Sequence, residues 1–422
     1  MTDAQQTADA KTGSSEAEPS GPAPVPLLAP REGVPPVTAD AEAFARVVAA
    51  FAEGSGPVAV DAERASGYRY GQRAYLVQLR REGAGTALID PIACPDFTPL
   101  NDALADTEWV LHAATQDLPC LRDIGMVPKR LFDTELAGRL AGFARVGLGL
   151  MVERVLGYSL EKGHSAADWS TRPLPEPWLR YAALDVELLV DLRDALEDEL
   201  RGQGKLEWAL EEFAAIAAAP PPVPRKDPWR RTSGVHRLRK RRQLAAVREL
   251  WTTRDRIAQR RDMSPTKVLP DAAIMAAALA MPADARALAS VQGFGGARMN
   301  RKQLQRWQEA VDRARALPDA ALPQLGQEPS SGPPPHRAWG DKAPAAAARL
   351  AAARSAVTAH AEELRLPQEN LLSPEVVRRL CWEPPAPATP EAVSPVLRSL
   401  GAREWQIEQT APLLARAIES AG

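Results

Sequence analysis

The sequence predicts an α/β domain with a mixed sheet, followed by one or two domains made only of helices. Apolar runs typical of strands lie close together early in the chain and then alternate with helical patterns. Proline-rich stretches interrupt the chain after about residue 217 and again after about residue 318. Between these stretches, Leu244, Val247 and Leu250 recur with helical spacing.

The expected domain boundaries follow these changes in composition. The predicted segments are a disordered tail rich in Pro, Ala, Ser and Gly (1–36), the α/β domain (37–216), a linker (217–234), a helical domain (235–317), a Pro-rich linker (318–344) and a second helical domain (345–422). With 422 residues, the chain is long enough for several domains with cores of their own.

The elements of the α/β domain can be taken in order. The pattern T-A-D-A-E-A-F from Thr38 predicts a capped amphipathic helix. Strands are expected at 58–63, 74–80, 86–90, 109–112 and 130–133. The first three of these follow one another so closely that they predict an antiparallel meander, and helices are expected between the later ones.

The charge of the chain is unevenly distributed. The net charge is only −2, but residues 225–316 contain 22 basic residues against 8 acidic ones. Such a segment is typical of a polyanion-binding surface, and a solvated helical face is the alternative. The candidate nucleic-acid-binding residues are Arg237, Arg239, Lys240, Arg241, Arg242 and Lys267.

The cysteines and the hydropathy favour a cytoplasmic protein. Cys94, Cys120 and Cys381 are far apart and lack C-x-x-C spacing, so they indicate neither a disulfide framework nor a zinc site. The sequence contains no apolar run of membrane-spanning length and no signal-peptide core. We therefore expect a soluble protein in the reducing cytoplasm.

Asp61 and Glu63 form the first candidate site. They come at the end of the apolar strand at 58–63, and residues two apart on a strand share a face. Two carboxylates about 4 Å apart repel by roughly 4 kcal/mol at an effective dielectric near 20. A hard cation such as Mg²⁺ or Mn²⁺ removes this repulsion, whereas the alternative is a solvated strand end.

Two later segments offer partners for this pair. His112 ends an apolar strand, and Asp117 starts the following helix, where it is either a helix cap or faces back toward the strand ends. His112 itself is expected to be a hydrogen-bonded strand-end residue. Tyr181 and Asp185 are four residues apart and share one face of a predicted helix. The alternative is that Tyr181 lies in the core and Asp185 on the surface.

The order of these pieces resembles the ribonuclease D branch of the DnaQ-like 3′–5′ exonucleases. A D-x-E strand, an H-x₄-D-L segment and a Y-x₃-D helix follow one another as in that family. The segments at 132–137 (F-D-T-E-L-A) and 162–174 are also similar, although Ser165 is followed by Ala where many members have Arg. The resemblance covers residues 38–215 and implies an RNase H-like fold with a mixed five-stranded sheet.

The resemblance also implies a site with two divalent cations, Mg²⁺ or Mn²⁺. Asp61, Glu63 and Asp185 would hold the first ion. Asp61 would also bridge to the second ion, which Asp117 would support directly or through water. Tyr181 would orient or deprotonate the attacking water, and the product would be a nucleoside 5′-monophosphate.

The helical part resembles a second known domain. Residues 254–271 and 281–294 are similar to the helicase-and-RNase-D C-terminal (HRDC) domain, a small bundle that helps to engage nucleic acid. Pro367 and Leu371 repeat the pattern of Pro265 and Leu269, which indicates a divergent second copy.

These observations lead to three functional hypotheses. The first is a metal-dependent 3′–5′ exoribonuclease that trims RNA with a free 3′ end, such as a tRNA precursor. The second keeps the same chemistry but acts on DNA in repair, and the third is a noncatalytic nucleic-acid-binding protein. A monomer is favoured over an oligomer, and no membrane partner is expected.

Overall fold

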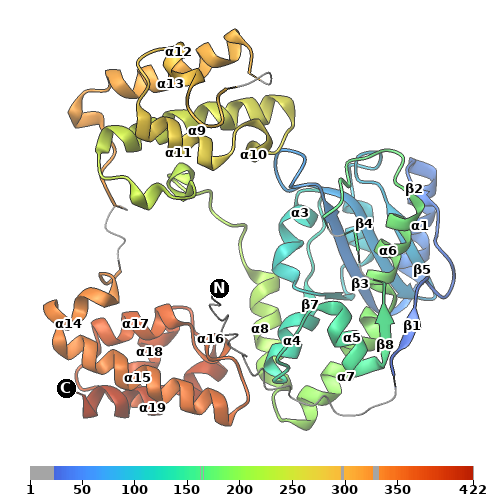
Figure 1. Ribbon diagram of the computed structural model, residues 1–422. Helices are drawn as coiled ribbons and strands as arrows, with labels where there is room; N and C mark the ends of the chain where they lie inside the picture. The colour runs from blue at the N-terminus through green and yellow to red at the C-terminus, as the bar shows by residue number, and fades with distance from the viewer. Residues whose placement is uncertain (1–22, 162, 165, 296–298, 327–331, 422) are drawn as a thin grey trace, which may run out of the picture.

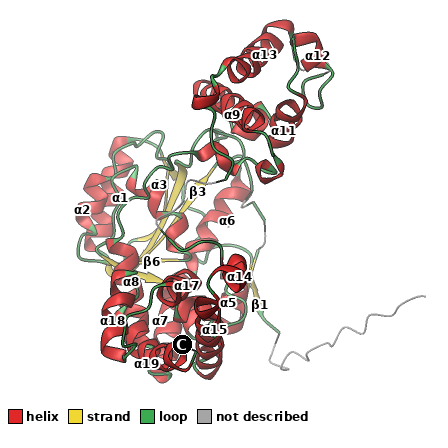
Figure 2. Cartoon of the chain, turned by 90° about the vertical axis from the view of Figure 1, so that its left-hand side faces the viewer, coloured by secondary structure: helices red, strands yellow, loops and turns green. Residues whose placement is uncertain are grey.

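The computed structural model describes residues 23–421 except 162, 165, 296–298 and 327–331. Figure 1 shows an α/β domain, a middle helical domain joined to it by an extended segment, and a C-terminal helical domain packed beside it. Figure 2 shows the strands enclosed between helices of the α/β domain, with the middle domain standing apart.

The α/β domain is built on a mixed sheet. Within the described residues this sheet has six strands in the order β2-β5-β4-β3-β6-β7. Their bounds are β2 Val37–Thr38, β3 Ser55–Arg64, β4 Ala74–Glu82, β5 Gly85–Ile89, β6 Glu108–Leu111 and β7 Arg130–Asp133. Strands β3, β4 and β5 form the expected antiparallel meander, and β6 and β7 run parallel to β3.

Five of these strands were expected, and β2 is the addition. It pairs in parallel with β5 at the edge of the sheet through Val37 and Thr38. A two-residue strand has no detectable alternation, and Thr38 also begins the pattern of the following helix. That helix, α1 (Ala41–Glu53), starts where its N-cap Asp40 accepts a hydrogen bond from the Ala43 N–H at 2.8 Å.

The domain boundaries drawn from composition remain predictions, but the structure corrects the expected disordered tail. Strand β1 (Val25–Leu27) pairs in parallel with β8 (Tyr158–Leu160). The partly buried Leu27 packs against the main core, which explains why this proline-flanked apolar segment is held. Residues 1–22 lie outside the described residues.

Helices flank the sheet and supply the rest of the core. Those of the α/β domain after α1 are α2 Thr98–Ala103, α3 Leu118–Arg122, α4 Thr134–Leu140, α5 Leu148–Leu156, α6 Glu176–Glu187, α7 Leu189–Gly202 and α8 Leu206–Ala218. Helix α6 packs across β3, β4 and β5. This packing fixes its position relative to the central strand.

The two helical domains share one order of elements. The middle domain contains α9 Arg241–Arg261, α10 Pro265–Val268, α11 Asp271–Ala280, α12 Ala285–Ala289 and α13 Arg301–Ala316. The C-terminal domain contains α14 Trp339–Lys342, α15 Pro344–Glu363, α16 Gln368–Leu371, α17 Pro374–Trp382, α18 Pro390–Ser399 and α19 Glu404–Ser420. In both, a long helix is followed by a single-turn helix and three further helices.

The backbone supports this likeness and corrects its register. After the long helix, Asp262 and Arg365 both have a positive φ, of 46° and 53°. The extended residue that ends the single-turn helix is Leu269 in one domain, with φ −158°, and Leu372 in the other, with φ −157°. Leu269 therefore corresponds to Leu372 instead of the expected Leu371, because the two segments are offset by one residue.

The C-terminal domain shares its core with the α/β domain. Buried residues of the sheet, of α7 and α8, and of α15 to α19 belong to a continuous hydrophobic cluster. Trp208 of α8 stacks on Trp405 of α19 with ring centroids 5.0 Å apart. The Glu211 carboxylate accepts the Glu404 and Trp405 N–H groups at 2.7 and 3.2 Å, so α8 caps the start of α19.

At a second close contact between the α/β and C-terminal domains, the α/β domain has room only for a glycine. Gly142 has a φ of +86°, and a Cβ built on it would lie 2.7 Å from the carbonyl oxygen of Arg365. A larger residue at this position would separate the two backbones.

The middle domain has a hydrophobic cluster of its own and contacts the α/β domain through polar groups. Asp262 lies 3.6 Å from Arg69 and 3.7 Å from Arg73, and it accepts the Tyr70 N–H at 3.2 Å. Lys267 Nζ lies 3.7 Å from the centre of the Tyr68 ring. All these α/β residues belong to the loop that follows β3.

Candidate active site

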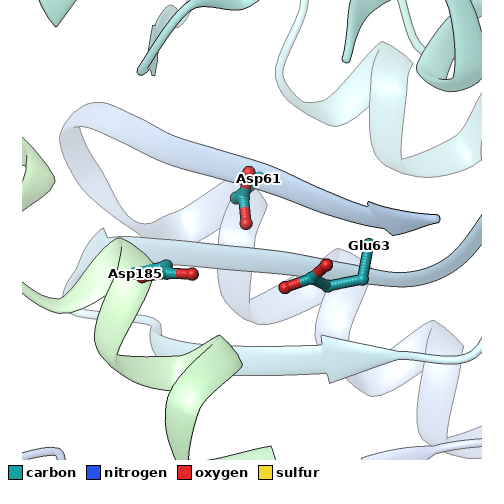
Figure 3. Close-up of side chains that lie close together, drawn as sticks. All are labelled: Asp61, Glu63 and Asp185. Atoms are coloured by element: carbon teal, nitrogen blue, oxygen red, sulfur yellow. The ribbon is translucent and has the colours of Figure 1, made fainter. Parts of the chain in front are cut away.

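The central strand and α6 bring three carboxylates together. Asp61 and Glu63 project from the same face of β3, opposite Gln78 and Leu76 of β4. Asp185 reaches them from α6, and ligand oxygens of the three residues lie within 4.8 Å of one another. Figure 3 shows their carboxylates converging from the strand and the helix. The pairing of β3 with β4 is irregular just after Glu63, where the strand end leaves its regular register.

Asp117 lines the same cavity but is not part of that close group. It is the N-cap residue of α3, yet its side chain caps no helix N–H. Instead, its carboxylate lies 3.3 Å from the guanidinium of Arg64. Of the two alternatives left open by the sequence, the structure favours a carboxylate that faces the strand ends.

A tight turn directs Asp117 toward the cavity. Ala113 adopts a left-handed conformation with φ 61° between β6 and the short 3₁₀ helix Ala114–Gln116. The buried Asp133 carboxylate at the end of β7 accepts the N–H groups of Ala113 and Ala114 at 3.0 and 2.9 Å. These hydrogen bonds compensate for a backbone conformation that is unfavourable for alanine.

Tyr181 lies one helical turn before Asp185 on α6, as expected. Its phenol hydrogen-bonds the Asp185 carboxylate, and its side chain lines the cavity. Burial raises the pKa of Tyr181 above its usual value, and the neighbouring Asp185 and Glu63 carboxylates raise it further. The phenol therefore keeps its proton in the metal-free protein.

Burial and mutual repulsion disfavour the ionised form of these carboxyl groups. Burial raises the pKa of Glu63 to about 10, with further contributions from Asp61, Asp185 and Asp117. Burial also raises the pKa of Asp117 to about 8, assisted by Asp61. The pKa values of Asp61 and Asp185 are raised for the same principal reason. Such a cluster is stable either with bound protons or with a cation.

Arg64 is a site residue that the sequence analysis missed. It lines the cavity, contacts Asp117 and donates to the Gln116 carbonyl at 2.6 Å. Its position next to Glu63 in the D-A-E-R segment was the available signal. The cavity has a volume of about 500 Å³. His112 also lines it and lies 2.9 Å from the Thr134 hydroxyl, in agreement with a hydrogen-bonded strand-end residue; burial lowers the pKa of His112 to about 4.

The expected basic residues do not form a single surface. Arg242 donates to the carbonyl oxygens of Arg315 and Leu317 at 2.7 and 2.8 Å, so it fastens the end of α13. Arg241 similarly bonds the carbonyl oxygens of Leu322 and Pro323. Arg237, Arg239 and Lys240 are exposed, whereas Lys267 lies apart from them on α10, beside Tyr68. Their role in nucleic-acid binding remains a prediction.

Comparison with known proteins assigns the domains. A family model described as 3′–5′ exonuclease matches residues 36–201, and one described as HRDC domain matches 243–311. A third, described as 3′ to 5′ exonuclease C-terminal domain, matches 332–418. Ribonuclease D of Gluconacetobacter diazotrophicus is 34% identical over 335 residues, which are 78% of this chain and 81% of that protein. This chain belongs to the ribonuclease D family.

Other members and solved structures agree with this assignment. Escherichia coli ribonuclease D is 33% identical over 274 residues, which are 63% of this chain and 72% of that protein. Its crystal structure, described as that of an exoribonuclease involved in structured RNA processing, matches with a TM-score of 0.65 at 27% identity and covers 86% of this chain and 98% of that one. A Bifidobacterium adolescentis protein matches with a TM-score of 0.85 at 40% identity, covering 94% of this chain and 100% of that one.

The ribonuclease D assignment confirms the expected 3′–5′ exoribonuclease class and the fold of an exonuclease domain followed by an HRDC domain. The DnaQ-like exonuclease family depends on divalent metal, and the acidic cluster of this chain provides a group that could hold such an ion. Among the described helices, none is both long and apolar enough to cross a membrane. The expected cytoplasmic location remains a prediction.

Proposed function

We propose that this ribonuclease D hydrolyses single nucleotides from the 3′ end of RNA at the cluster of Asp61, Glu63 and Asp185. The observation that carries the proposal is the convergence of three carboxylates from two elements within 4.8 Å. Their raised pKa values indicate a site that lacks its positive charge.

The donor set fits hard divalent cations. Carboxylate oxygens are the ligands that Mg²⁺ and Mn²⁺ prefer, and the cavity contains no competing thiolate or imidazole cluster among the residues that the structure describes. We propose that Asp61, Glu63 and Asp185 hold one ion and that Asp61 and Asp117 support a second. When bound, the ions would supply a nucleophilic water and would neutralise charge on the scissile phosphate.

The remaining residues of the cavity have distinct parts in this proposal. Tyr181, which hydrogen-bonds Asp185 and lines the cavity, would orient or deprotonate the attacking water. Arg64 balances Asp117 and lies where a phosphate oxygen could be contacted. The products would be nucleoside 5′-monophosphates.

We propose structured RNA with a single-stranded 3′ end, such as a tRNA precursor, as the substrate class. Support comes from Escherichia coli ribonuclease D, which is described as acting in structured RNA processing. The alternative of DNA is tested by matched oligonucleotides of the two kinds.

The test compares wild-type protein with Asp61→Asn and Asp185→Asn in Mg²⁺, Mn²⁺ or EDTA. Each substitution keeps the shape of the side chain but removes a charged ligand, so release of mononucleotides should fall by about 10²-fold or more. EDTA should abolish the release by the wild type. Asp198→Asn, an exposed carboxylate on α7, is the matched control and should keep the full rate.

Three outcomes would contradict the proposal. If Asp185→Asn released mononucleotides at the wild-type rate, the carboxylate cluster would not be the site of the reaction. Equal rates on DNA and RNA would remove the RNA preference, and binding without hydrolysis by the wild type would indicate the noncatalytic class.

A further inference from the structure

A glutamine side chain is buried beside the carboxylate cluster without a hydrogen-bond partner. Gln78 lies on β4, and 0% of its surface is exposed. Within the part of the chain that the structure describes, neither its Oε1 nor its Nε2 has a partner. A buried amide that has lost its hydrogen bonds to water destabilises the fold unless other groups replace them. An unpaired amide at this place therefore indicates a role beyond packing.

The register of the sheet places Gln78 directly opposite Asp61. The two residues are partners in the antiparallel pairing of β3 with β4, so their side chains leave the same face of the sheet. The Cβ atoms of such a pair lie about 4.5–5.5 Å apart. From that distance, rotation about the side-chain torsions of a glutamine brings its amide to a carboxylate oxygen while both strands stay in place.

The other neighbours on this face do not offer the amide a free partner. Leu76 and Leu88, which flank the glutamine along β4 and across on β5, are apolar and fully buried. Arg80, two residues further along β4, donates to a threonine hydroxyl at 2.8 Å and lies 3.5 Å from the Glu187 carboxylate. Its guanidinium is therefore engaged elsewhere. Asp61 remains as the polar neighbour that the amide can serve.

We propose that Gln78 is a positioning residue whose amide N–H donates a hydrogen bond to the Asp61 carboxylate when Asp61 holds a cation. The inference rests on the proposed function, in which Asp61 contacts both ions. A carboxylate with two ions to serve must keep one orientation, and a hydrogen-bond donor behind it fixes that orientation. Because the amide is neutral, it orients Asp61 without replacing the positive charge that the ions supply.

The test replaces Gln78 by Met in the full-length protein. Methionine keeps the length of the side chain but removes the amide. Leu88→Met is the matched control, because it changes the packing next to Gln78 on the same face and leaves every polar group in place. The affinity for Mn²⁺ is measured by titration, with the free ion counted from its EPR signal. Calorimetry in EDTA gives the melting temperature without the ion.

The two measurements should change in different directions for Gln78→Met. Its affinity for Mn²⁺ should fall by about tenfold or more, as it does when a metal ligand loses its supporting hydrogen bond. In EDTA the same variant should melt at the wild-type temperature or about 2–4 °C above it, because the substitution removes an unpaired buried amide. Leu88→Met should leave the Mn²⁺ affinity unchanged. A residue that serves only for packing would not combine weaker metal binding with undiminished stability.

The affinity for Mn²⁺ decides the inference. If Gln78→Met bound Mn²⁺ as tightly as the wild type, or lost no more affinity than Leu88→Met, the positioning role would be overturned and the proposed function would stand. A wild type that bound no Mn²⁺ would refute the proposed metal site and this inference with it. If Gln78→Met were unfolded at the temperature of the titration, Gln78→Leu would be compared with Leu88→Met by the same criterion.

Discussion

The two helical domains have the same order of helices but attach to the α/β domain in different ways. The C-terminal domain shares a hydrophobic cluster with it, stacks Trp405 on Trp208 and has its last helix capped by Glu211. The middle domain has its own cluster and meets the α/β domain through the loop after β3. The C-terminal domain therefore forms one folded unit with the α/β domain, whereas the middle domain, with a similar order of helices, can separate from it.

The chemistry of the two contacts explains the difference. Trp405 is buried, with 3% of its surface exposed, and burial of an aromatic side chain contributes several kcal/mol. At the other contact, the side chains of Arg69 and Asp262 are 41% and 42% exposed. Exposed ion pairs of this kind contribute about 0–1 kcal/mol each and weaken with salt.

The largest effect is expected from Trp405→Ala. Loss of a buried Trp should lower the free energy of unfolding by about 3–5 kcal/mol. The melting temperatures of the α/β and C-terminal domains should therefore fall together. Calorimetry with residual nuclease activity as a second probe measures this. Ile274→Ala, a fully buried residue of the middle domain, is the matched control. Ile274→Ala should lower only the melting temperature of the middle domain. If either variant shifted the melting temperatures of both units equally, the comparison would be contradicted.

The second effect is a pH dependence confined to the α/β and C-terminal domains. Folding raises the pKa of Glu63 from 4.5 to about 10 and that of Asp117 from 3.8 to about 8. The folded state therefore binds more protons than the unfolded state between these values, so metal-free stability should fall as the pH rises through this range. In EDTA, the melting temperature of these domains should decrease as the pH rises from about 6 to about 9.

The middle domain serves as the internal reference for this experiment, because its cluster contains none of these carboxylates. Addition of Mg²⁺ or Mn²⁺ should reduce the pH dependence, since the cations replace the protons. Equal slopes for the two transitions, or a slope that metal leaves unchanged, would disprove the electrostatic explanation.

The smallest effect is expected from Asp262→Asn at the polar contact. Asp262 has a positive φ of 46°, which asparagine also adopts readily, so the end of α9 should be preserved. The loss of the ion pairs with Arg69 and Arg73 should weaken docking by about 1 kcal/mol or less. Hydrogen exchange of the loop at 66–73 should increase, more at low salt than at high salt.

A double-mutant cycle with Arg73→Gln checks that this is a direct interaction. If the charges act on each other, the double variant should cost less than the sum of the two single variants. Full additivity would show that Asp262 and Arg73 act independently, and the polar contact would then need another explanation.

Local spacing explains what the sequence could predict. The i, i+2 pair of Asp61 and Glu63 and the i, i+4 pair of Tyr181 and Asp185 depend only on the geometry of one strand and one helix. The strands of the meander are likewise defined by short apolar runs. The sequence therefore placed the elements of the cluster, and the resemblance to an exonuclease family joined them.

Long-range contacts explain what the sequence could not predict. Strand β1 is defined by its pairing with β8, more than a hundred residues away. The turn at Ala113 contains no glycine to mark it and is held by Asp133 from a different strand. The partners of Arg242 likewise depend on how α9 packs against α13. None of these features has a signal within a single segment.

In the sequence, the middle domain lies between the α/β domain and the C-terminal domain, which share one hydrophobic core. The chain leaves α8 at Ala218 and reaches the 3₁₀ helix Pro228–Arg231, and residues 219–227 span at most about 30 Å. After the middle domain, the chain returns to a C-terminal domain that is fastened to that same α8. An undocked middle domain therefore stays tethered at both ends, at an effective concentration in the millimolar range. Redocking is intramolecular, so dilution of the protein should leave its extent unchanged.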